Sequence, residues 1–230
     1  VLIQGIGGFH LACDARNEAA VCELRRRKGR DRKPFAVMFA DRRQLRSWCS
    51  VGLRELEAIG SPAAPIVLLK KSPACEAAHS VAPETPTLGA MLSYSPLHSL
   101  LLEECGFPLV MTSANRSEEP IQYRREDAWD AMKEIADFAL VHDREIEMFA
   151  DDSIVRVIGK QSRMIRRSRG FVPSAISPRE QFAKSILSFG ADLKNTFCIA
   201  KEQSAILSQH LGDMEGERAI AQQQRALAHF

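Results

Sequence analysis

The sequence has few aromatic residues and no long apolar run. Only 7% of its 230 residues are aromatic, with two Trp and two Tyr, and no aromatic residue alternates with the arginines. A base-stacking surface for single-stranded nucleic acid is therefore not indicated. No apolar run approaches the roughly 18 residues that a membrane-spanning helix needs, and no signal-peptide pattern opens the chain. We expect no membrane association and a cytoplasmic protein.

Metal-ligand spacing is also lacking. The six cysteines are scattered and form no CxxC pair, and His10, His98 and His142 follow no HxH or HxxxH spacing. We therefore expect neither a zinc knuckle, nor a redox dithiol, nor a metal site built from protein ligands. Reduced thiols suit a cytosolic protein. Basic and acidic residues nearly cancel, at 31 against 29, so the overall charge points to no partner.

Helices and strands alternate along most of the chain. Asn17 is a predicted N-cap for a helix that ends near Gly29, and Ser95 precedes a second helix that Gly106 closes. The other predicted elements are strands at 34–40, 65–71 and 108–113, a long loop at 72–93, a helix at 125–136 and a hairpin at 153–167. This alternation favours an α/β or α+β domain in which helices cover a mixed sheet.

Ser, Pro and Gly residues between 168 and 178 indicate an interdomain linker. Residues 1–178 are therefore predicted to form one domain, and residues 179–230 to begin a second. The second part supplies about two strands and one or two helices, so we expect it to pack weakly and to unfold first. Because the chain opens on Val1 and closes in an unfinished helix, we expect a fragment of a longer protein.

The densest charged feature is a basic run, in which seven of the nine residues from 25 to 33 are Lys or Arg. Lys28, Arg30 and Lys33 lie at a glycine-containing helix exit, from which several donors can converge on phosphates. The alternative interpretation is a solvated basic helix end, because cations are favourable at a helix C-terminus. A second basic cluster at 163–169 could form the other wall of one phosphate pocket.

Two short segments offer polar groups at turns. Ser113 and Asn115 follow a buried strand, where α/β proteins bind small polar ligands or phosphates. Gly7 and Gly8, in the segment GIGGFH that ends at His10, permit close backbone approach to a ligand. The segment is neither GxGxxG nor a Walker loop. Each signal is weak alone, because such turns are common for local backbone reasons.

The late hairpin brings Ser153, which precedes its first strand, close to Arg166, which ends its second strand. The two side chains could therefore share one pocket. Asp151 and Asp152 come immediately before Ser153 and could recruit Mg²⁺. Ion pairing of these carboxylates with neighbouring arginines is the interpretation that we favour.

Taken in order, these segments resemble a known family. The similarity to the YrdC-like domain of HypF, the carbamoyltransferase family of nickel–iron hydrogenase maturation, rests on GGFHLACDARNEAAVCELRRRKGRDRKPFAVMF, PIVLLKK, GAMLSYSPLHSLLL, PLVMTSANRSEEPI, HDREIEMFADDSIVRV and IRRSRGFVP. It covers residues 1–178 and continues through SFGADLKNTFCIAKEQSAILSQHLGDME into the start of the family's carbamoyl-transfer domain. The resemblance implies a YrdC-like twisted mixed sheet covered by helices, followed by a truncated actin-like (ASKHA-type) domain.

The resemblance also implies a reaction. ATP, accompanied by Mg²⁺, would react with carbamate derived from carbamoyl phosphate to give carbamoyl-adenylate and pyrophosphate. The carbamoyl group would then pass to the C-terminal cysteine of HypE. In the family, an acylphosphatase domain and zinc-finger modules precede this region and the rest of the carbamoyl-transfer domain follows it. These parts are expected partners of the present chain.

The resemblance assigns roles to the polar segments. The residues with an implied catalytic role match the family's Lys-x-Arg, Lys-Pro and Ser-x-Asn signatures: Lys28, Arg30, Lys33, Ser113 and Asn115. The residues with an implied role in nucleotide binding are Gly7, Gly8, His10, Lys28, Arg30, Ser113, Asn115, Ser153 and Arg166. No nucleophilic side chain is required, because the carbamate is itself the nucleophile and the protein supplies positioning and charge.

Two positions depart from the family's pattern, since Gln4 stands where Lys is usual and Ser93 where Pro is usual. Two alternative functions stay open. One is threonylcarbamoyl-adenylate synthesis for tRNA modification, although GIGGFH stands where those YrdC proteins have a Thr-containing turn. The other is a non-catalytic module that binds double-stranded RNA weakly through the basic residues of 25–33 and 163–169.

Overall fold

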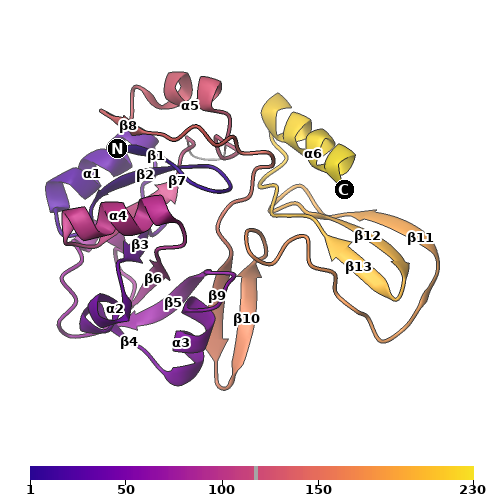
Figure 1. Cartoon of the computed structure of the whole chain (residues 1–230), viewed down its shortest axis with the longest axis horizontal. Coiled ribbons are helices and arrows are strands. Elements are labelled where there is room, and N and C mark those ends of the chain that lie inside the picture. Colours follow the sequence, from indigo (N-terminus) through magenta and orange to yellow (C-terminus); the bar gives the residue numbers. More distant parts are fainter. Residues whose placement is uncertain (117–118) are drawn as a thin grey trace.

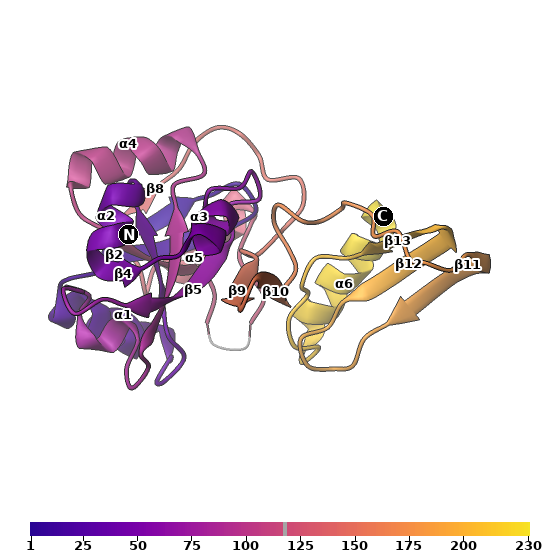
Figure 2. The ribbon, with the colours of Figure 1, turned by 90° about the horizontal axis from the view of Figure 1, so that it is seen from below.

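The computed structural model describes residues 1–116 and 119–230 of the chain. Figure 1 shows two lobes side by side, a larger one that holds the N-terminus and a smaller one, orange to yellow, that holds the C-terminus. The view turned by 90° separates the same two lobes (Figure 2). Within the described part of the chain, no helix is both long and apolar enough to cross a bilayer.

A ten-stranded mixed sheet forms the centre of the larger lobe. Its strands follow the order β10-β9-β5-β6-β3-β7-β2-β1-β8, and β4 pairs with β5 beside this path. The strands are β1 Leu2–Gln4, β2 Phe9–Asp14, β3 Ala36–Phe39, β4 Cys49–Ser50, β5 Ile66–Lys71, β6 Thr87–Leu92, β7 Leu109–Ser113, β8 Ala139–Leu140, β9 Ile154–Ile158 and β10 Gln161–Arg166. The predicted mixed sheet is confirmed, because β3 pairs parallel with β6 but antiparallel with β7.

Helices cover both faces of this sheet. They are α1 Glu18–Lys28, α2 Arg42–Trp48, α3 Leu53–Ile59, α4 Pro96–Cys105 and α5 Arg125–Met132, with a 3-10 turn at His79–Val81. One apolar cluster packs residues of α1, α2, α3 and α5 against one face, and a second packs Leu102 of α4 against the other. Burial on both faces explains why the strands read as continuous apolar runs.

Helix α1 confirms the predicted boundaries and delivers the basic run to its place. The Asn17 side chain accepts a hydrogen bond from the backbone of Ala20, and Gly29 ends the helix in the left-handed region, at φ +66°. The face of α1 that carries the apolar Val21 also carries Arg25 and Lys28, and all three are buried. Part of the basic run is therefore directed into the protein.

The predicted loop at 72–93 is wrong for its last third. Residues Thr87–Leu92 form β6, which lies inside the sheet between β3 and β5. The sequence did not predict this strand because its residues are buried on both faces of the sheet and so show no alternation of apolar and polar residues. It also contains Gly89, which is uncommon inside strands. A Cβ at Gly89 would lie 3.2 Å from Cγ2 of Ile66, so the glycine fits the close packing there.

The smaller lobe is a three-stranded antiparallel sheet with one helix. Its elements are β11 Phe182–Phe189, β12 Phe197–Glu202, β13 Ser204–Leu207 and α6 Glu217–His229. Phe197, Leu211 and Ala226 of this lobe share one apolar cluster with Ile121 and Tyr123 of the larger lobe. The smaller lobe therefore shares part of its core with the larger one. That this lobe packs weakly and unfolds first stays a prediction. The predicted boundary at 178 stays a prediction.

Candidate functional site

The ammonium group of Lys28 binds the turn that follows β7. Its Nζ donates to the backbone oxygens of Ser113 at 2.7 Å and Asn115 at 2.5 Å, and to Oδ1 of Asn115 at 2.7 Å. Ser113 Oγ donates to the same Oδ1 at 2.8 Å, and Nδ2 of Asn115 donates to the Glu119 backbone at 2.5 Å. The structure thus joins two segments, 25–33 and 113–115, that the sequence singled out separately.

Lys28 is a buried lysine with a lowered pKa. It is 2% exposed, and burial, assisted by the charge of Arg30, lowers its pKa to about 7. The charge of Asp151 acts in the opposite direction, so Asp151 lies within electrostatic reach of Lys28. An anion placed beside Lys28 would favour its charged form and would itself be stabilised. This coupling is what a binding site for phosphate or carboxylate requires.

The loop after α1 is held by Arg25, which the sequence analysis did not single out. Its guanidinium donates to the backbone oxygens of Ser80 at 2.5 Å and Arg30 at 2.8 Å, and it lies over the Phe35 ring at 4.5 Å from the centroid. The signal was present, because Arg25 lies four residues after buried Val21 on the same helix face. Arg25 is therefore a structural residue.

Arg30 and Lys33 lie on the loop that Arg25 organises. Arg30 donates to the backbone oxygens of Lys33 at 3.1 Å and Pro34 at 2.8 Å, and it lies over Phe35 at 5.2 Å. Arg30 is half-buried and Lys33 is exposed. The two residues thus reach the surface on the loop after α1, and their role in holding phosphates stays a prediction.

The glycines of the first hairpin are required by packing. A Cβ on Gly7 would lie 2.3 Å from the backbone oxygen of Ala150, and one on Gly8 would lie 2.5 Å from Cδ1 of Ile121. The backbone of Ala150 also donates to the Gly7 oxygen at 2.7 Å. Gly7 and Gly8 therefore bring the N-terminal hairpin against the segment that leads into Asp151. Their predicted contact with a nucleotide stays a prediction.

His10 belongs to a buried polar network around Asp152. Its Nε2 lies 3.1 Å from Oδ2 of Asp152, and Arg169 donates to Oδ1 of the same carboxylate at 2.9 Å. Burial alone would raise the pKa of Asp152, but the hydrogen bond from His10 and the charge of Arg169 outweigh burial and hold this pKa well below its ordinary value. Arg169 also lies 3.6 Å from the centre of the Tyr94 ring.

The late hairpin places Ser153 and Arg166 close together but gives them different surroundings. Ser153 is fully buried, and its hydroxyl donates to the Arg169 oxygen at 2.9 Å and accepts from the Ser168 backbone at 2.8 Å. Arg166 binds Asp151 at 2.5 Å and is half-buried. The favoured interpretation of the acidic pair is confirmed, since each carboxylate is paired with an arginine. Nucleotide contacts of Ser153 and Arg166 stay predictions.

The smaller lobe reaches this hairpin. The backbone of His210 donates to the Arg167 oxygen at 3.1 Å, and Nε2 of Gln209 donates to the Phe149 oxygen at 3.1 Å. Burial lowers the pKa of His210, and the charge of Arg166 lowers it further. The segment at 208–211 thus lies beside the Asp151–Arg166 ion pair.

Several residues of the two basic segments are engaged by groups of the protein itself. Arg26 and Arg27 both bind Glu23, and Arg27 also binds Asp137 at 2.8 Å. Arg167 donates to the backbone oxygens of Phe171 and Ser174. Arg26 and Arg27 are thus paired with acidic side chains and Arg167 with backbone oxygens, which weakens the field that these residues offer to a nucleic-acid backbone.

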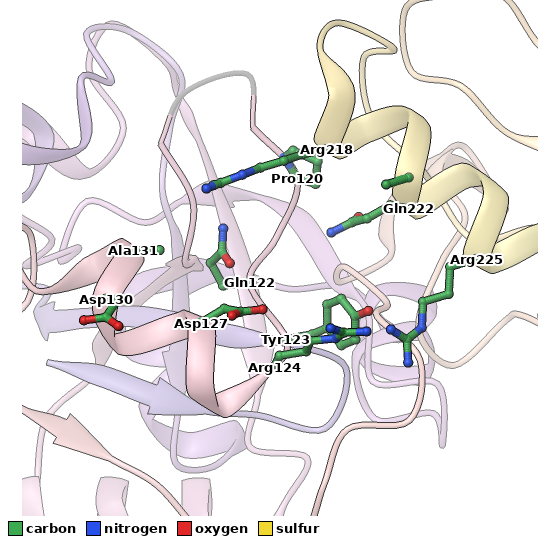
Figure 3. A pocket seen from close by; sticks show the side chains of 11 residues that line it. Pro120, Gln122, Tyr123, Arg124, Asp127, Asp130, Ala131, Arg218, Gln222 and Arg225 are labelled. Atoms are coloured by element: carbon green, nitrogen blue, oxygen red, sulfur yellow. The ribbon is translucent and has the colours of Figure 1, made fainter.

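The larger lobe and the boundary between the lobes each hold a cavity. One of about 490 Å³ is lined by Gly5, Ser95 and His142 among others. A larger one, of about 730 Å³, lies between the lobes, where Arg225 of α6 extends toward Tyr123 and Arg124 (Figure 3). Neither of these two cavities is lined by Lys28, Ser113 or Asn115.

Within the described part of the chain, no three His, Cys, Asp or Glu side chains are grouped so that they could hold a metal ion. Asp151 and Asp152, the carboxylates that could have recruited Mg²⁺, are engaged by Arg166 and Arg169. The donor set at Lys28 and Arg30 suits an anion, and a magnesium ion would have to arrive bound to its nucleotide.

Family models match both lobes. The Sua5_yciO_yrdC model, described as telomere recombination, matches residues 1–168, and the HypF Kae1-like domain model matches residues 181–230. The carbamoyltransferase HypF of Rhizobium leguminosarum bv. viciae is 42% identical over 237 aligned positions, which cover 100% of this chain and 31% of that protein. The HypF of Synechocystis sp. is 41% identical, over 100% of this chain and 30% of that protein. The chain thus spans about a third of the length of the curated relatives it matches.

Solved structures extend the comparison. A full-length HypF in its phosphate- and nucleotide-bound form is 44% identical with a TM-score of 0.95, over 99% of this chain and 36% of that one. The HypF of T. kodakarensis gives the same TM-score at 39% identity, over 100% of this chain and 30% of that one. Sua5 of P. abyssi complexed with L-threonine shares the fold, with a TM-score of 0.63 at 17% identity. The match covers 73% of this chain and 50% of that one. The chain therefore belongs to the Sua5/YciO/YrdC family and carries, in the order found in HypF, a YrdC-like part followed by a Kae1-like part.

Proposed function

We propose that the larger lobe forms carbamoyl-adenylate from ATP and carbamate, as one step of a HypF carbamoyltransferase. The observation that supports this most is the binding of buried Lys28 to Ser113 and Asn115, which joins the two signatures that the resemblance implied. Burial keeps the charge of Lys28 sensitive to a neighbouring anion. Such a site can hold a triphosphate and a carboxylate together, which is the main requirement of the reaction.

The reaction balances without a protein nucleophile. A carbamate oxygen attacks the α-phosphorus of ATP, a new O–P bond forms, and the bond to the β-phosphate oxygen breaks. Pyrophosphate leaves with the electron pair. Lys28 and Arg30 would stabilise the negative charge on the phosphates, and Ser113 and Asn115 would orient them. A magnesium ion bound to the triphosphate would neutralise further charge.

The resemblance to HypF implies the wider assignment. In a longer HypF, the carbamoyl group would pass to the C-terminal cysteine of HypE during hydrogenase maturation, with carbamate supplied from carbamoyl phosphate by an acylphosphatase domain. All six cysteines of this chain are free thiols, which supports a reducing compartment such as the cytoplasm.

Isotope exchange between pyrophosphate and ATP tests the proposal. The chain should catalyse exchange when ammonium carbamate is present, and Asn115→Ala should reduce it by at least about tenfold, since a hydrogen bond to a charged group is lost. Arg54→Ala, which removes an exposed ion pair with Glu57 on α3, is the matched control and should leave exchange unchanged.

Three outcomes separate the functions. Exchange that needs L-threonine together with bicarbonate would favour threonylcarbamoyl-adenylate synthesis. Duplex-RNA binding that is stronger than ATP binding would favour the RNA-binding module. A folded chain that neither binds ATP nor supports exchange with carbamate would contradict the proposal.

A further inference from the structure

Residues 119–123 lie between the turn that holds Asn115 and the smaller lobe. On the side of the turn, Nδ2 of Asn115 donates to the backbone oxygen of Glu119 at 2.5 Å. The backbone of Gln122 also donates to the oxygen of Ala114 at 2.9 Å, so this segment is bonded to the turn twice. Residues 119–123 therefore help to set the position of the turn.

On its other side, this segment contacts helix α6 of the smaller lobe. Nε2 of Gln222 donates to the backbone oxygen of Ile121 at 3.3 Å. The guanidinium of Arg218 lies 3.8 Å from the carboxylate of Glu119. Figure 3 shows both side chains extending from α6 toward the segment. A helix of the smaller lobe thus holds the same backbone that the turn binds.

Close packing around Ile121 couples the two lobes. The Ile121 side chain is buried in an apolar cluster that includes Phe197, Leu211 and Ala226 of the smaller lobe. In the larger lobe it packs so closely on the first hairpin that a Cβ on Gly8 would lie 2.5 Å from its Cδ1. Close-packed interiors transmit displacements. A shift of α6 would therefore move Ile121, and the turn with it.

The smaller lobe is held against the larger one at a second place. The side chain of Gln209 is buried, and its Nε2 donates to the Phe149 oxygen at 3.1 Å. The backbone of His210 donates to the Arg167 oxygen at 3.1 Å. Because these bonds lie outside α6, the helix keeps its place when a single side chain on it is changed. A substitution on α6 can therefore test its contact with residues 119–123 alone.

Gln222 is an unfavourable residue for stability alone. Its Oε1 is buried and has no hydrogen-bond partner among the described residues. Such an atom lowers stability, because it loses its hydration without compensation. A leucine at this position would avoid that cost and forms helices equally well. In the part of the chain that the structure describes, the side chain makes one hydrogen bond, to Ile121. The amide therefore serves the contact with residues 119–123.

We propose that α6 positions the 113–115 turn through residues 119–123, with Gln222 as the positioning residue. The smaller lobe thereby contributes to a site whose own side chains all belong to the larger lobe. The inference rests on the proposed function for what the turn binds. Its geometry rests on the contacts at Glu119 and Ile121. Because Gln222 acts through the turn, its loss should matter only while the turn can still orient a ligand.

A double-mutant cycle tests the inference. In carbamate-dependent pyrophosphate exchange, Gln222→Leu should lower the rate about threefold to tenfold, the range expected for one hydrogen bond. Its melting temperature should not fall, because the substitution removes an unpaired buried oxygen. In an Asn115→Ala background the same substitution should lower the rate less than about twofold further, because both residues act through one turn. Gln224→Leu, at an exposed glutamine of the same helix, is the matched control and should leave exchange unchanged.

A direct measurement separates failure of this inference from failure of the proposed function. Without substrate, the side-chain NH₂ signals of Asn115 in a ¹⁵N–¹H spectrum should shift in Gln222→Leu and stay in place in Gln224→Leu. Unmoved Asn115 signals would overturn the inference, as would an equal loss of exchange in both backgrounds or a loss that follows a fall in melting temperature. Shifted signals in a chain whose wild type shows no exchange would sustain the inference and overturn the proposed reaction.

Discussion

Nζ of Lys28 and Oδ1 of Asn115 lie 2.7 Å apart, although 86 residues separate them in the sequence. The contact crosses from the last turn of α1 to the end of β7, and it leaves all three N–H donors of the lysine with acceptors. Lys28 therefore fixes the 113–115 turn, and its charge lies directly beneath the groups that would orient a ligand.

This contact predicts that ATP binding takes up a proton. The pKa of Lys28 is lowered to about 7 in the free protein, and bound phosphates would raise it toward its ordinary value. Affinity for ATP should therefore fall as pH rises from about 7 to 9, by up to about tenfold per unit. Calorimetry in two buffers of different ionisation enthalpy would measure up to one proton bound per ATP near pH 8.

Lys28→Met is the control for this linkage. The variant should bind ATP weakly, with no proton uptake assigned to this group and a flatter pH profile. If the wild type binds ATP without any proton uptake between pH 7 and 9, then Lys28 is not adjacent to the phosphates.

Arg25 and Arg30 both lie over Phe35, but we expect Arg25 to contribute mainly to stability and Arg30 mainly to ATP binding. Arg25→Ala removes a buried guanidinium bound to several backbone oxygens, so it should lower the free energy of unfolding by about 3 kcal/mol. Arg30→Ala should cost less than about 1 kcal/mol, because that side chain is half-buried, yet weaken ATP binding at least about tenfold. Urea denaturation and calorimetry measure the two effects. Equal loss of stability in both variants would favour a purely structural basic run.

Replacement of Gly7 and of Gly29 by alanine should lower the free energy of unfolding by different amounts. Gly7→Ala would place a methyl group 2.3 Å from the Ala150 oxygen, so it should destabilise the chain by about 2–3 kcal/mol. Gly29→Ala meets open space but must adopt φ +66°, which should cost about 1 kcal/mol. Urea midpoints of the two variants give the comparison. A harmless Gly7→Ala would mean that the hairpin does not need this close approach.

The sequence predicted well those elements whose ends carry chemical signals. Asn17 and Gly29 delimit α1, Ser95 and Gly106 delimit α4, and each does so through a local hydrogen bond or a left-handed conformation. It failed at β6, which has no such signals and is buried on both faces. Local rules describe how an element begins and ends, whereas the sheet order depends on contacts between distant segments.

The residues of the candidate site could be predicted from local signals, whereas their contacts could not. Lys28, Ser113 and Asn115 were found as separate motifs, because residue type and local position suggested their chemistry. Their direct contact, and the pairing of Asp152 with His10, arise from strand pairing that no local pattern encodes. The proximity of His10 and His98, whose rings are 6.0 Å apart, was not predicted for the same reason, since β2 and α4 bring the two residues together.

The paired carboxylate of Asp152 predicts a loss of stability in acid. Its pKa is held below the ordinary value by His10 and Arg169 against the effect of burial, so its contribution to stability is complete above about pH 4 and is lost as pH falls through the folded pKa. Asp152→Asn leaves Arg169 unpaired and should cost about 3–5 kcal/mol at pH 7. The difference in urea midpoint between wild type and variant should shrink below pH 4. A difference that stays constant from pH 7 to pH 3 would mean that Asp152 is not the titrating group.

The shared apolar cluster predicts that the two lobes unfold together. Both tryptophans of the chain, Trp48 and Trp129, belong to the larger lobe, so tryptophan fluorescence reports the unfolding of that lobe alone. Leu211→Ala removes a buried side chain of the smaller lobe, at a cost of about 2–5 kcal/mol. If the lobes are coupled, this change should lower the fluorescence midpoint in urea, whereas Leu193→Ala, at a leucine that is 66% exposed, should not. An unmoved midpoint in Leu211→Ala, with an earlier transition seen by circular dichroism, would show instead that the smaller lobe packs weakly and unfolds first.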